Sequence, residues 1–481
     1  MAARLLILLT FALTAGYPSV ITDTVGWTTR DRQFPGPALR YIYYDTLRGL
    51  HITYKDGYGA IRYSFKPRGE NWCFRQPVLL NPYPRNLGSL DINITNGRPL
   101  ISADRLEQGR RVVSCFSDSN AGAGRFYETE IATDARFSLV AAARFGYPKF
   151  AAIRNDSLYY LSPWSFRNLG PIGPFPRHNI AASKISSRLG FVWAEHTSRK
   201  LFFRETPDNG GTWYPVHSLS DSVPGPLNRS LFAGSLVYDS IQPHLVCDLY
   251  DGTDRGKVQL WHYCPYQRPA WSLICEYRFP DTARLGLHTL ALDRPAIGID
   301  RRRINSDLNR LYVVWEQFNP DNIDPVTGIA RTDIWGCASF DNGRTWTLPV
   351  RLTQPDETSK RFPSLAEVVD DTLHILCFAD RQAGSWELGE GNATRNAVIH
   401  LRVPAEIFTS QPVENHSITA LRIPTILNAR TVNLLPADFH LYDRTGRKVP
   451  ARNLHLLPAG VYFMQIPAPS GQIVQPLVKP E

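Results

Sequence analysis

An eight-residue pattern occurs twice in the chain and constrains its fold more than any other feature. It reads TPDNGGTW at residues 206–213 and SFDNGRTW at 339–346, so both copies fit Ser/Thr-x-Asp-x-Gly-x-x-Trp. By chance alone, one such match would occur in only about one of several hundred chains of this length. Alternating β-branched and aromatic residues flank both copies, which predicts that each copy lies in a turn between two strands.

Each residue type in the pattern has a role in such a turn. The aspartate can accept hydrogen bonds from backbone N–H groups of its own loop, and the glycine can take a positive φ. The tryptophan is expected to start the next strand and to bury its ring against the neighbouring sheet, while the hydroxyl can bond to the backbone. We therefore interpret these residues as structural and not catalytic: Thr206, Asp208, Gly210, Trp213, Ser339, Asp341, Gly343 and Trp346.

Degenerate copies of the same pattern of strands, loop and turn run through most of the chain. They divide it into seven units of four strands, at residues 36–80, 88–131, 137–175, 177–224, 231–285, 290–353 and 361–403. A period of about 40 to 60 residues is typical of a β-propeller, in which each unit forms one blade. We predict an all-β fold of about seven blades, with six as the alternative because the third unit is weak. The last unit lacks an outermost strand, which residues 19–27 could supply.

The N-terminal residues predict export. Arg4 precedes an apolar run that ends at Ala12, and small residues follow as far as Gly16, as in a secretory signal peptide. No later stretch reaches about eighteen apolar residues, so we predict no membrane span. The chain is accordingly divided into a signal peptide at 1–16, a propeller at 17–407 and a small C-terminal β-sandwich at 408–481.

Composition and charge favour a folded protein without a nucleic-acid partner. Apolar residues make up 43% of the chain and charged residues 20%, which argues against disorder. The net charge is +9, and the one dense basic cluster, Arg301–Arg303, is not interleaved with aromatic residues as a nucleic-acid platform would be. We predict a solvated loop at this cluster.

Cysteine spacing and acidic loops give no complete metal site. The seven cysteines lack metal-ligand spacing, and we expect most of them to be buried thiols, although Cys264 and Cys275 could face each other across a hairpin. The acidic stretches 248–254 and 319–328 could offer carboxylates to calcium, but neither completes a calcium-loop pattern. We predict no cofactor, with structural calcium as the alternative.

The two complete copies of the pattern resemble the Asp-box (BNR) repeats of sialidase-like β-propellers. The resemblance covers most of residues 20–405 and implies the fold, but Asp-box propellers include sialidases, other glycosidases, photosystem assembly factors and sorting receptors. Sialidases hold the substrate carboxylate with three arginines, and their N-terminal signature is an aromatic residue followed by Arg-Ile-Pro. The comparable string here, LRIP at 421–424, has leucine in the aromatic position and lies in the tail. No sialidase residue is therefore carried over.

The tail resembles a type IX secretion (Por-type) C-terminal sorting domain. Two segments carry the resemblance, FHLYDRTGRKV at 439–449 and LPAGVYFMQI at 457–466, while residues 423–436 occupy the place of that domain's first strand. The residues that match are Tyr442, Asp443, Gly446, Arg447, Gly460, Tyr462 and Phe463, and the terminal lysine segment is reduced to Lys479. The resemblance implies recognition by the type IX secretion machinery and a secreted or outer-surface location in a Gram-negative-type bacterium.

Blade topology predicts where a ligand would bind. The Asp-box turn joins the third and fourth strands, so the loops between the second and third strands leave on the opposite face, where acidic and basic residues recur and would form a polar ring. The candidate ligand-binding residues are Asp56, Asp104, Arg105, Glu195, Arg199, Asp251, Arg255, Glu316, Asp380 and Arg381. The alternative is that these residues are solvated loop ends in which aspartates form turns.

No catalytic motif is found, so we favour a non-catalytic function. We predict an exported, monomeric propeller that binds a glycan or a cell-surface protein. The alternative is a glycoside hydrolase of sialidase-like type, or a lyase, that uses the carboxylates and arginines of the polar ring.

Overall fold

The computed structural model describes residues 20–33, 40–74, 76–81, 84–144, 146–163, 165–300, 309–409, 440–443, 448–449, 460–468 and 471–479. The predicted signal peptide, the Arg301–Arg303 cluster and the segments at 421–424 and 423–436 lie outside these residues. The chain divides into two compact units, Met1–Glu414 and Asn415–Glu481.

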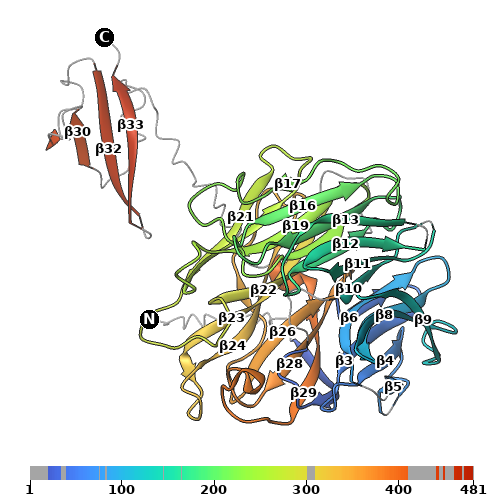
Figure 1. Cartoon of the computed structure of the whole chain (residues 1–481). Coiled ribbons are helices and arrows are strands. Elements are labelled where there is room, and N and C mark those ends of the chain that lie inside the picture. Colours follow the sequence, from blue (N-terminus) through green and yellow to red (C-terminus); the bar gives the residue numbers. More distant parts are fainter. Residues whose placement is uncertain are drawn as a thin grey trace, which may run out of the picture. The chain divides into compact units, whose positions relative to one another are not determined.

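The first unit is a β-propeller of seven blades (Figure 1). Blade 1 comprises β2 (Ile42–Asp45), β3 (Gly49–Lys55), β4 (Ile61–Pro67) and β5 (Val78–Asn81), and blade 2 comprises β6 (Asn86–Asn93), β7 (Arg98–Glu107), β8 (Arg110–Asp118) and β9 (Phe126–Thr133). Blade 3 comprises β10 (Arg136–Ala141), β11 (Lys149–Arg154), β12 (Ser157–Ser162) and β13 (Ser165–Pro171). Blade 4 comprises β14 (His178–Ala182), β15 (Leu189–Ala194), β16 (Leu201–Thr206) and β17 (His217–Ser218).

The remaining blades follow the same order from the axis outward. Blade 5 comprises β18 (Ser235–Tyr238), β19 (Pro243–Leu249), β20 (Lys257–Tyr263) and β21 (Trp271–Arg278), and blade 6 comprises β22 (Leu292–Asp300), β23 (Leu311–Ile323), β24 (Ala330–Ser339) and β25 (Val350–Arg351). Blade 7 comprises β26 (Ser359–Leu365), β28 (Thr372–Asp380), β29 (Asn396–Pro404) and β1 (Ile21–Thr28), while β27 (Val368–Val369) pairs in parallel with β22. In Figure 1 the innermost strands β6, β10, β22 and β26 lie at the centre and β5 and β9 lie at the periphery.

The ring is closed by the N-terminal strand. Strand β1 pairs antiparallel with β29, from Ile21 opposite Arg402 to Thr28 opposite Asn396. It therefore supplies the outermost strand that the sequence of the last unit lacks, as predicted. The predicted all-β fold and the count of seven blades are confirmed, and the alternative of six is wrong because the weak third unit forms a complete sheet of four strands.

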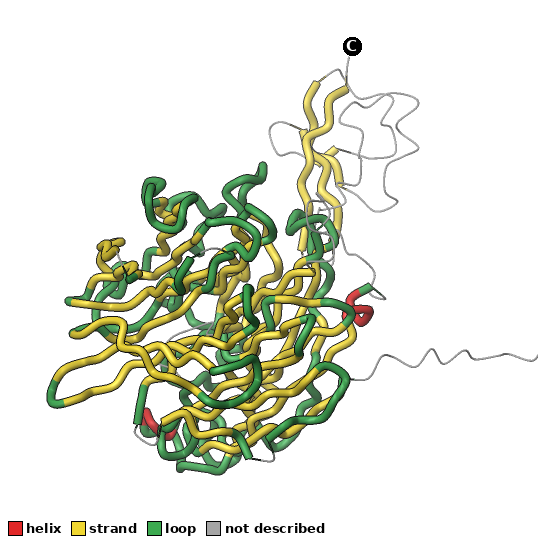
Figure 2. Tube along the Cα trace, turned by 90° about the vertical axis from the view of Figure 1, so that its right-hand side faces the viewer, coloured by secondary structure: helices red, strands yellow, loops and turns green. Residues whose placement is uncertain are grey.

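Burial explains why the repeat forms radial sheets. Strands β3, β14, β15, β19, β22 and β26 are buried along their whole length, whereas the outermost strands β9 and β13 are largely exposed. Apolar side chains on both faces of each blade pack against the two neighbouring blades, which gives near-continuous apolar strands instead of strict alternation. Helical structure among the described residues is limited to short 3₁₀ turns, including η2 (Trp386–Leu388) and η3 (Ala405–Phe408), drawn red in Figure 2.

We call the face with the loops between second and third strands the upper face and the opposite one the lower face. Ion pairs cross the channel near its lower end, where the innermost strands finish. Lys184 Nζ lies 2.6 Å from Asp91 Oδ1, and Arg40 Nη1 lies 2.9 Å from Glu367 Oε2. Arg40 Nη2 also donates to the carbonyl of Leu236 at 3.2 Å. The lower end of the channel is thus filled by charged side chains that bind one another.

The two repeated turns have the hydrogen bonds that the sequence predicts. Thr212 N donates to Asp208 Oδ1 at 2.7 Å, and Gly210 N donates to Thr206 Oγ1 at 2.8 Å. In the second turn Thr345 N donates to Asp341 Oδ1 at 2.9 Å, and Gly343 N donates to Ser339 Oγ at 2.8 Å. Gly210 and Gly343 have φ values of 99° and 85°. Each turn joins the third and fourth strands of its blade on the lower face.

The two tryptophans differ from each other and from the prediction. Trp346 is buried, with 3% of its surface exposed, and its Nε1 donates to Ser272 Oγ of blade 5 at 3.1 Å. Trp213 is only half-buried, between the rings of Tyr160 and Phe191. Neither residue starts a strand, because β17 and β25 each begin a few residues later. The prediction that each tryptophan starts the next strand is therefore wrong, and the predicted burial against the neighbouring sheet is only partial for Trp213.

The second unit contains one sheet among its described residues. Its strands are β30 (His440–Asp443), β31 (Lys448–Val449), β32 (Gly460–Ala468) and β33 (Gly471–Lys479), in the order β31-β30-β32-β33. Tyr442 is paired with Phe463, and Asp443 with Tyr462. Five of the residues that carry the tail resemblance, with Gly460 as the fifth, therefore lie on two adjacent strands, while Gly446 and Arg447 lie outside the described residues.

All seven cysteines are free thiols. Cys275 lies opposite Leu260 in its hairpin, so Cys264 and Cys275 do not face each other. Six of the cysteines are buried and Cys73 is exposed. In the part of the chain that the structure describes, no helix is long and apolar enough to cross a membrane.

Candidate functional site

Two cavities lie on the upper face. The axial pocket has a volume of about 180 Å³ and is lined by Arg32, Phe175, Arg177, His196, Arg199, Leu231, Phe232, Leu287, His288, Arg294, Arg361, Phe362, Ser385 and Leu388. The blade 1–2 cavity has a volume of about 940 Å³ and is lined by Arg30, Arg32, Lys55, Gly59, Pro84, Arg85, Asn86, Asp104, Arg105, Leu106, Glu107, Arg111, Glu128 and Glu387. Arg32 lines both cavities.

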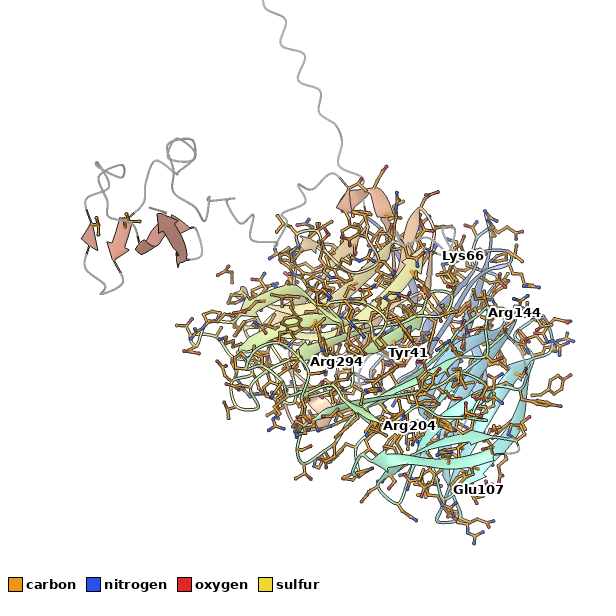
Figure 3. The ribbon with its side chains drawn as sticks, turned by 90° about the horizontal axis from the view of Figure 1, so that it is seen from above. Tyr41, Lys66, Glu107, Arg144, Arg204 and Arg294 are labelled. Atoms are coloured by element: carbon orange, nitrogen blue, oxygen red, sulfur yellow. The ribbon has the colours of Figure 1, made fainter. Side chains whose placement is uncertain are left out.

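Among the described residues, five arginines and no carboxylate line the axial pocket. Three of these arginines come from the beginnings of innermost strands. Arg177 directly precedes β14, Arg294 lies in β22 and Arg361 lies in β26. Because innermost strands converge on the propeller axis, their first residues meet there, and Figure 3 shows Arg294 near the centre of the ring.

Irregular backbone turns two of the lining side chains toward the pocket. Strand β22 shifts register between Asp293 and Ala296, and β26 shifts between Arg361 and Ser364. Arg294 and Phe362 lie in these bulges, and each has a φ of 54°. Bulges redirect side chains, and a left-handed conformation at a non-glycine residue costs free energy and recurs at functional sites.

Buried acids hold Arg294 in place from below. Arg294 Nη1 contacts Glu316 Oε1, and it lies 3.0 Å from Asp293 Oδ2. Glu316 also accepts a hydrogen bond at 2.7 Å from the backbone N–H of Phe362. The Phe362 ring lies 4.6 Å from the guanidinium of Arg294 and 5.1 Å from that of Arg361. One carboxylate thus fixes two neighbouring inner strands and the pocket side chains that they carry.

The other cations of the pocket have few partners. Within the described residues, Arg177 Nη1 and Arg199 Nη1 are buried without a hydrogen-bond partner, although only 7% of Arg177 is exposed. Burial lowers the pKa of Arg32 and of Arg199, and the neighbouring Arg294 lowers the pKa of Arg32 further. Desolvated guanidinium groups without partners are costly. An anion in the axial pocket would offset that cost.

Aromatic rings and a histidine complete the axial pocket. Phe175 is 49% exposed at its rim and lies 4.9 Å from the ring of His196. His288 is in a left-handed conformation, with a φ of 51°. Burial lowers its pKa, as do the charges of Arg32, Arg255 and Arg199. The lowered pKa favours the neutral imidazole of His288, and the pocket combines cationic and apolar walls.

The blade 1–2 cavity is lined by both charges, and most of its acids are engaged. Glu128 is bound by Arg85 through two contacts of 3.0 Å, and Arg105 lies 2.6 Å from Glu107. By contrast, no hydrogen bond or ion pair involves the Lys55 ammonium in the described ranges, although only 9% of this residue is exposed. Burial lowers the pKa of Lys55 to about 8, against the opposing charge of Glu387.

One wall separates the two cavities and is built from two segments of chain. Trp386 Nε1 donates to the carbonyl of Thr29 at 2.7 Å, and the backbone N–H of Trp386 donates to Asp31 Oδ2. Arg30 Nη1 lies 3.0 Å from Glu387 Oε1. The loop that contains η2 is thereby tied to the segment that follows β1. Arg32 belongs to this wall and reaches both cavities.

Of the ten candidates from the sequence, three line a cavity. Arg199 lines the axial pocket, and Asp104 and Arg105 line the blade 1–2 cavity. Two others support the axial pocket without lining it. Glu316 lies beneath it, as described above, and Arg255 Nη1 donates to the carbonyl of Gly286 at 2.9 Å, beside the loop of His288.

The other five candidates lie elsewhere. Four are acids whose carboxylates accept hydrogen bonds from N–H groups of their own loops: Asp56, Glu195, Asp251 and Asp380. Arg381 is exposed and lines neither cavity. The recurring acids of these loops therefore form turns and do not gather into one ring.

Sequence reasoning missed most of the axial pocket. Arg177, Arg294 and Arg361 were not among the candidates, although a signal for them exists. Each is an arginine at or just before the first strand of its repeat unit, in PRHNI, DRPAI and KRFPS. Alignment of the units by their first strands, instead of by their loops, would have placed the three arginines at the axis.

No group of three or more metal-ligating side chains is found among the residues that the structure describes. The two buried acids of the stretches considered for calcium, Asp324 and Asp248, have other partners. Asp324 binds Arg331 at 3.2 Å and the backbone N–H of Ala383 at 2.8 Å. Asp248 is fully buried and accepts from the N–H of Arg294 at 3.3 Å.

Several solved structures are similar to this chain in fold. They include the BP39L lectin from Burkholderia pseudomallei, with 12% identity and a TM-score of 0.44 over 71% of this chain and 93% of that one. An ulvan lyase shows 11% identity and a TM-score of 0.46 over 81% of this chain and 100% of its own. The intramolecular trans-sialidase from Ruminococcus gnavus shows 10% identity and a TM-score of 0.41 over 81% of this chain and 98% of its own.

No family model and no curated protein matches the sequence. At these identities and TM-scores the similar structures say nothing about ligand or chemistry. The functional conclusion therefore depends on the cavities themselves.

Proposed function

We propose that the protein is an exported propeller that binds an acidic glycan, with a carboxylate or sulfate of the sugar in the axial pocket. The single observation that carries the proposal is the composition of that pocket, whose described lining residues include five arginines and no acid. Arginine is suited to this role because its planar guanidinium donates two parallel hydrogen bonds to an oxyanion.

The apolar part of the pocket favours a sugar over a simple inorganic anion. Phe175, Leu287 and Phe232 contribute apolar surface beside the arginines. The exposed face of Phe175 at the rim provides a flat surface for the C–H face of a pyranose ring. Small-molecule sites typically combine apolar walls with a few polar groups that fix orientation.

Hydrolysis is the second candidate function, since two buried acids near the shared wall have pKa values suited to acid catalysis. Burial raises the pKa of Asp31 to about 6, and it raises the pKa of Asp380 to about 6. A glycosidase needs a pair of carboxyl groups that flank the scissile bond. Neither Asp31 nor Asp380 lines a cavity, which favours binding without cleavage. Release of reducing sugar from acidic glycans, lost in Asp31→Asn, would instead support hydrolysis.

Binding is tested with a glycan array followed by calorimetry. We expect uronic, sialic or sulfated glycans to bind and their neutral counterparts not to bind. The variant Arg177→Gln removes a nearly buried guanidinium and should weaken binding about tenfold to a hundredfold, the worth of a charge-assisted hydrogen bond. Arg381→Gln is the matched control, because it removes an exposed arginine outside both cavities. Equal affinity for galacturonic acid and galactose, or equal effects of the two variants, would reject the proposal.

The resemblance to sialidase-like Asp-box propellers and to type IX sorting domains supports a further part of the proposal, namely that the protein is delivered to the cell surface or beyond. The hydrogen-bonded aspartate turns fit the first resemblance, and the paired strands of Tyr442 and Phe463 fit the second. Fractionation of cells that express the chain with and without residues 415–481 tests this part. Appearance of the shortened protein outside the cell would contradict it.

A further inference from the structure

We propose that the ligand is an acidic oligosaccharide and not a single sugar, and that it extends from the axial pocket past Arg32 into the blade 1–2 cavity, where Lys55 and Arg111 bind its next acidic residues. This inference rests on the proposed function. It adds a second subsite and a ligand class in which acidic groups recur along a chain.

Arg32 is the first observation that links the two cavities. Among the residues that the structure describes, it is the one lining residue that they share. Within the described residues its half-buried guanidinium has no hydrogen bond or ion pair. The charges of Arg294 and Arg361 act on it, and so do the opposite charges of Glu387 and Asp31, which are bound to Arg30 and to the backbone of Trp386. A cation between two cavities, held near two other cations, fits an anionic ligand that passes from one cavity to the other.

Lys55 is the second observation, and it lies within the blade 1–2 cavity. It is the last residue of β3, and its backbone is fixed by Gln33, whose Oε1 accepts from Lys55 N at 2.8 Å. The neighbouring acid Glu387 is already paired with Arg30, and Asp104 accepts from Asn86 at 3.0 Å and from Phe137 N at 2.8 Å. The ammonium group of Lys55 is therefore buried while both neighbouring acids are bound to other groups, which leaves it able to bind an anionic ligand.

Size is the third observation. At about 180 Å³ the axial pocket is below the usual range for a drug-sized ligand, whereas the blade 1–2 cavity, at about 940 Å³, is near the top of that range. The larger cavity extends outward, since Glu107, one of its lining residues, lies at the periphery in Figure 3 while Arg294 lies near the centre. One ring fits the axial pocket, and several fit the cavity.

The charges that line the blade 1–2 cavity also favour an acidic oligosaccharide. In the part of the chain that the structure describes, six basic and four acidic residues line the blade 1–2 cavity. The acids are occupied by Arg85, Arg105 and Arg30 or by hydrogen-bond donors, as described above, and Arg111 lies at a longer distance of 3.6 Å from Asp104 with 40% of its side chain exposed. The cations that remain available are Lys55, Arg111 and Arg32, which suits recurring acidic groups better than a neutral chain.

The experiment compares ligands of different length by calorimetry on the full chain. The probes are galacturonic acid against tetragalacturonic acid, and a chondroitin sulfate disaccharide against the hexasaccharide. We expect the longer member of at least one series to bind more than tenfold tighter. In Lys55→Met and in Arg111→Gln this gain should fall to about threefold or less, while affinity for the shorter member stays unchanged.

The variants and controls separate this inference from the proposed function. Lys55→Met keeps the length and apolar stem of the side chain, and Arg111→Gln lies at an exposed position, so the second variant tests the inference even if the first does not fold. Arg381→Gln should leave the gain in affinity with ligand length unchanged. If acidic monosaccharides bind and length gives no gain, or if both variants weaken short and long probes equally, the second subsite is rejected and the proposed function stands. If no acidic probe binds, the proposed function itself fails.

Discussion

At the scale of single residues, the two repeated turns share one sequence pattern but are expected to contribute unequally to the free energy of unfolding. Both aspartates accept the same hydrogen bonds, from the backbone and hydroxyl of the threonine four positions later. The tryptophans differ because the surfaces beneath them differ. Trp346 is covered by blade 5 and bound to Ser272, whereas Trp213 remains half-exposed between Arg167 and Arg204, each 5.3 Å from its ring.

This difference predicts unequal losses of stability. Trp346→Ala should lower the free energy of unfolding by about 3–5 kcal/mol, as loss of a buried aromatic ring does, and Trp213→Ala by less than half of that. Asp341→Ala should cost about 1–2 kcal/mol because turn N–H groups lose their acceptor. Urea denaturation of the three variants measures the effects. Equal losses for the two tryptophans would show that burial does not govern this position.

At the scale of elements, the ring depends on a strand that is remote in sequence. Strand β1 completes blade 7, and Gly26 lies at an irregularity of its register. A Cβ atom at this position would lie 1.9 Å from Tyr54 Oη of blade 1. Glycine is therefore required here by the close approach of the neighbouring blade, and not by its own backbone angles.

Because Tyr54 lies so close to Gly26, we expect a larger residue at position 26 to weaken the pairing of β1 with β29. Gly26→Val should destabilise the fold by about 1–3 kcal/mol, the usual cost of overpacking, and the loss should be local to the contact of β1 with β29. Hydrogen exchange should show faster exchange in β29, with little change in blade 3. Thr24→Val is the control because Thr24 is exposed on the same strand. Unchanged exchange in β29 would mean that β1 does not hold the ring closed.

At the scale of the whole molecule, buried histidines make stability depend on pH. Burial lowers the pKa of His51 to about 3, and those of His178 and His374 to about 4. A lowered pKa in the folded state means that the unfolded chain binds more protons below about pH 6.5. The contribution of each histidine is therefore complete above pH 6.5 and declines as pH falls toward 4, by about 1.4 kcal/mol per pH unit.

Two buried acids act in the opposite direction but do not cancel this effect. Asp31 and Asp380 have pKa values raised to about 6, so protonation below pH 6 relieves part of their burial cost. Burial also lowers the pKa of His262 and His400, and it raises the pKa of Asp104, Asp248, Asp293 and Asp333. Because the histidines of the unfolded chain take up protons from about pH 6.5, above the pKa of about 6 of Asp31 and Asp380, we expect the melting temperature to fall from pH 7 to pH 5. His178→Phe should reduce the slope. A melting temperature that rises over this interval would show that the acids dominate.

The sequence by itself determined the fold, because a propeller is the sum of local repeats. Each blade is set by strands close together in the chain, and even the closure by residues 19–27 followed from the count of strands in the last unit. The turn chemistry of Asp208 and Asp341 is equally local, since each carboxylate bonds to residues within four positions. Such features are readable without knowledge of the neighbouring blade.

The tertiary structure alone decided the site and the burial of the turns. Arg177, Arg294 and Arg361 belong to different repeat units and meet only because the ring brings the innermost strands to one axis. The acids of the loops suggest a polar ring in the sequence, but they accept hydrogen bonds from their own turns. Trp213 is less buried than Trp346 because the neighbouring blades cover the two rings to different extents. Local patterns specify each blade, whereas contacts between blades, far apart in the chain, specify what the molecule can bind.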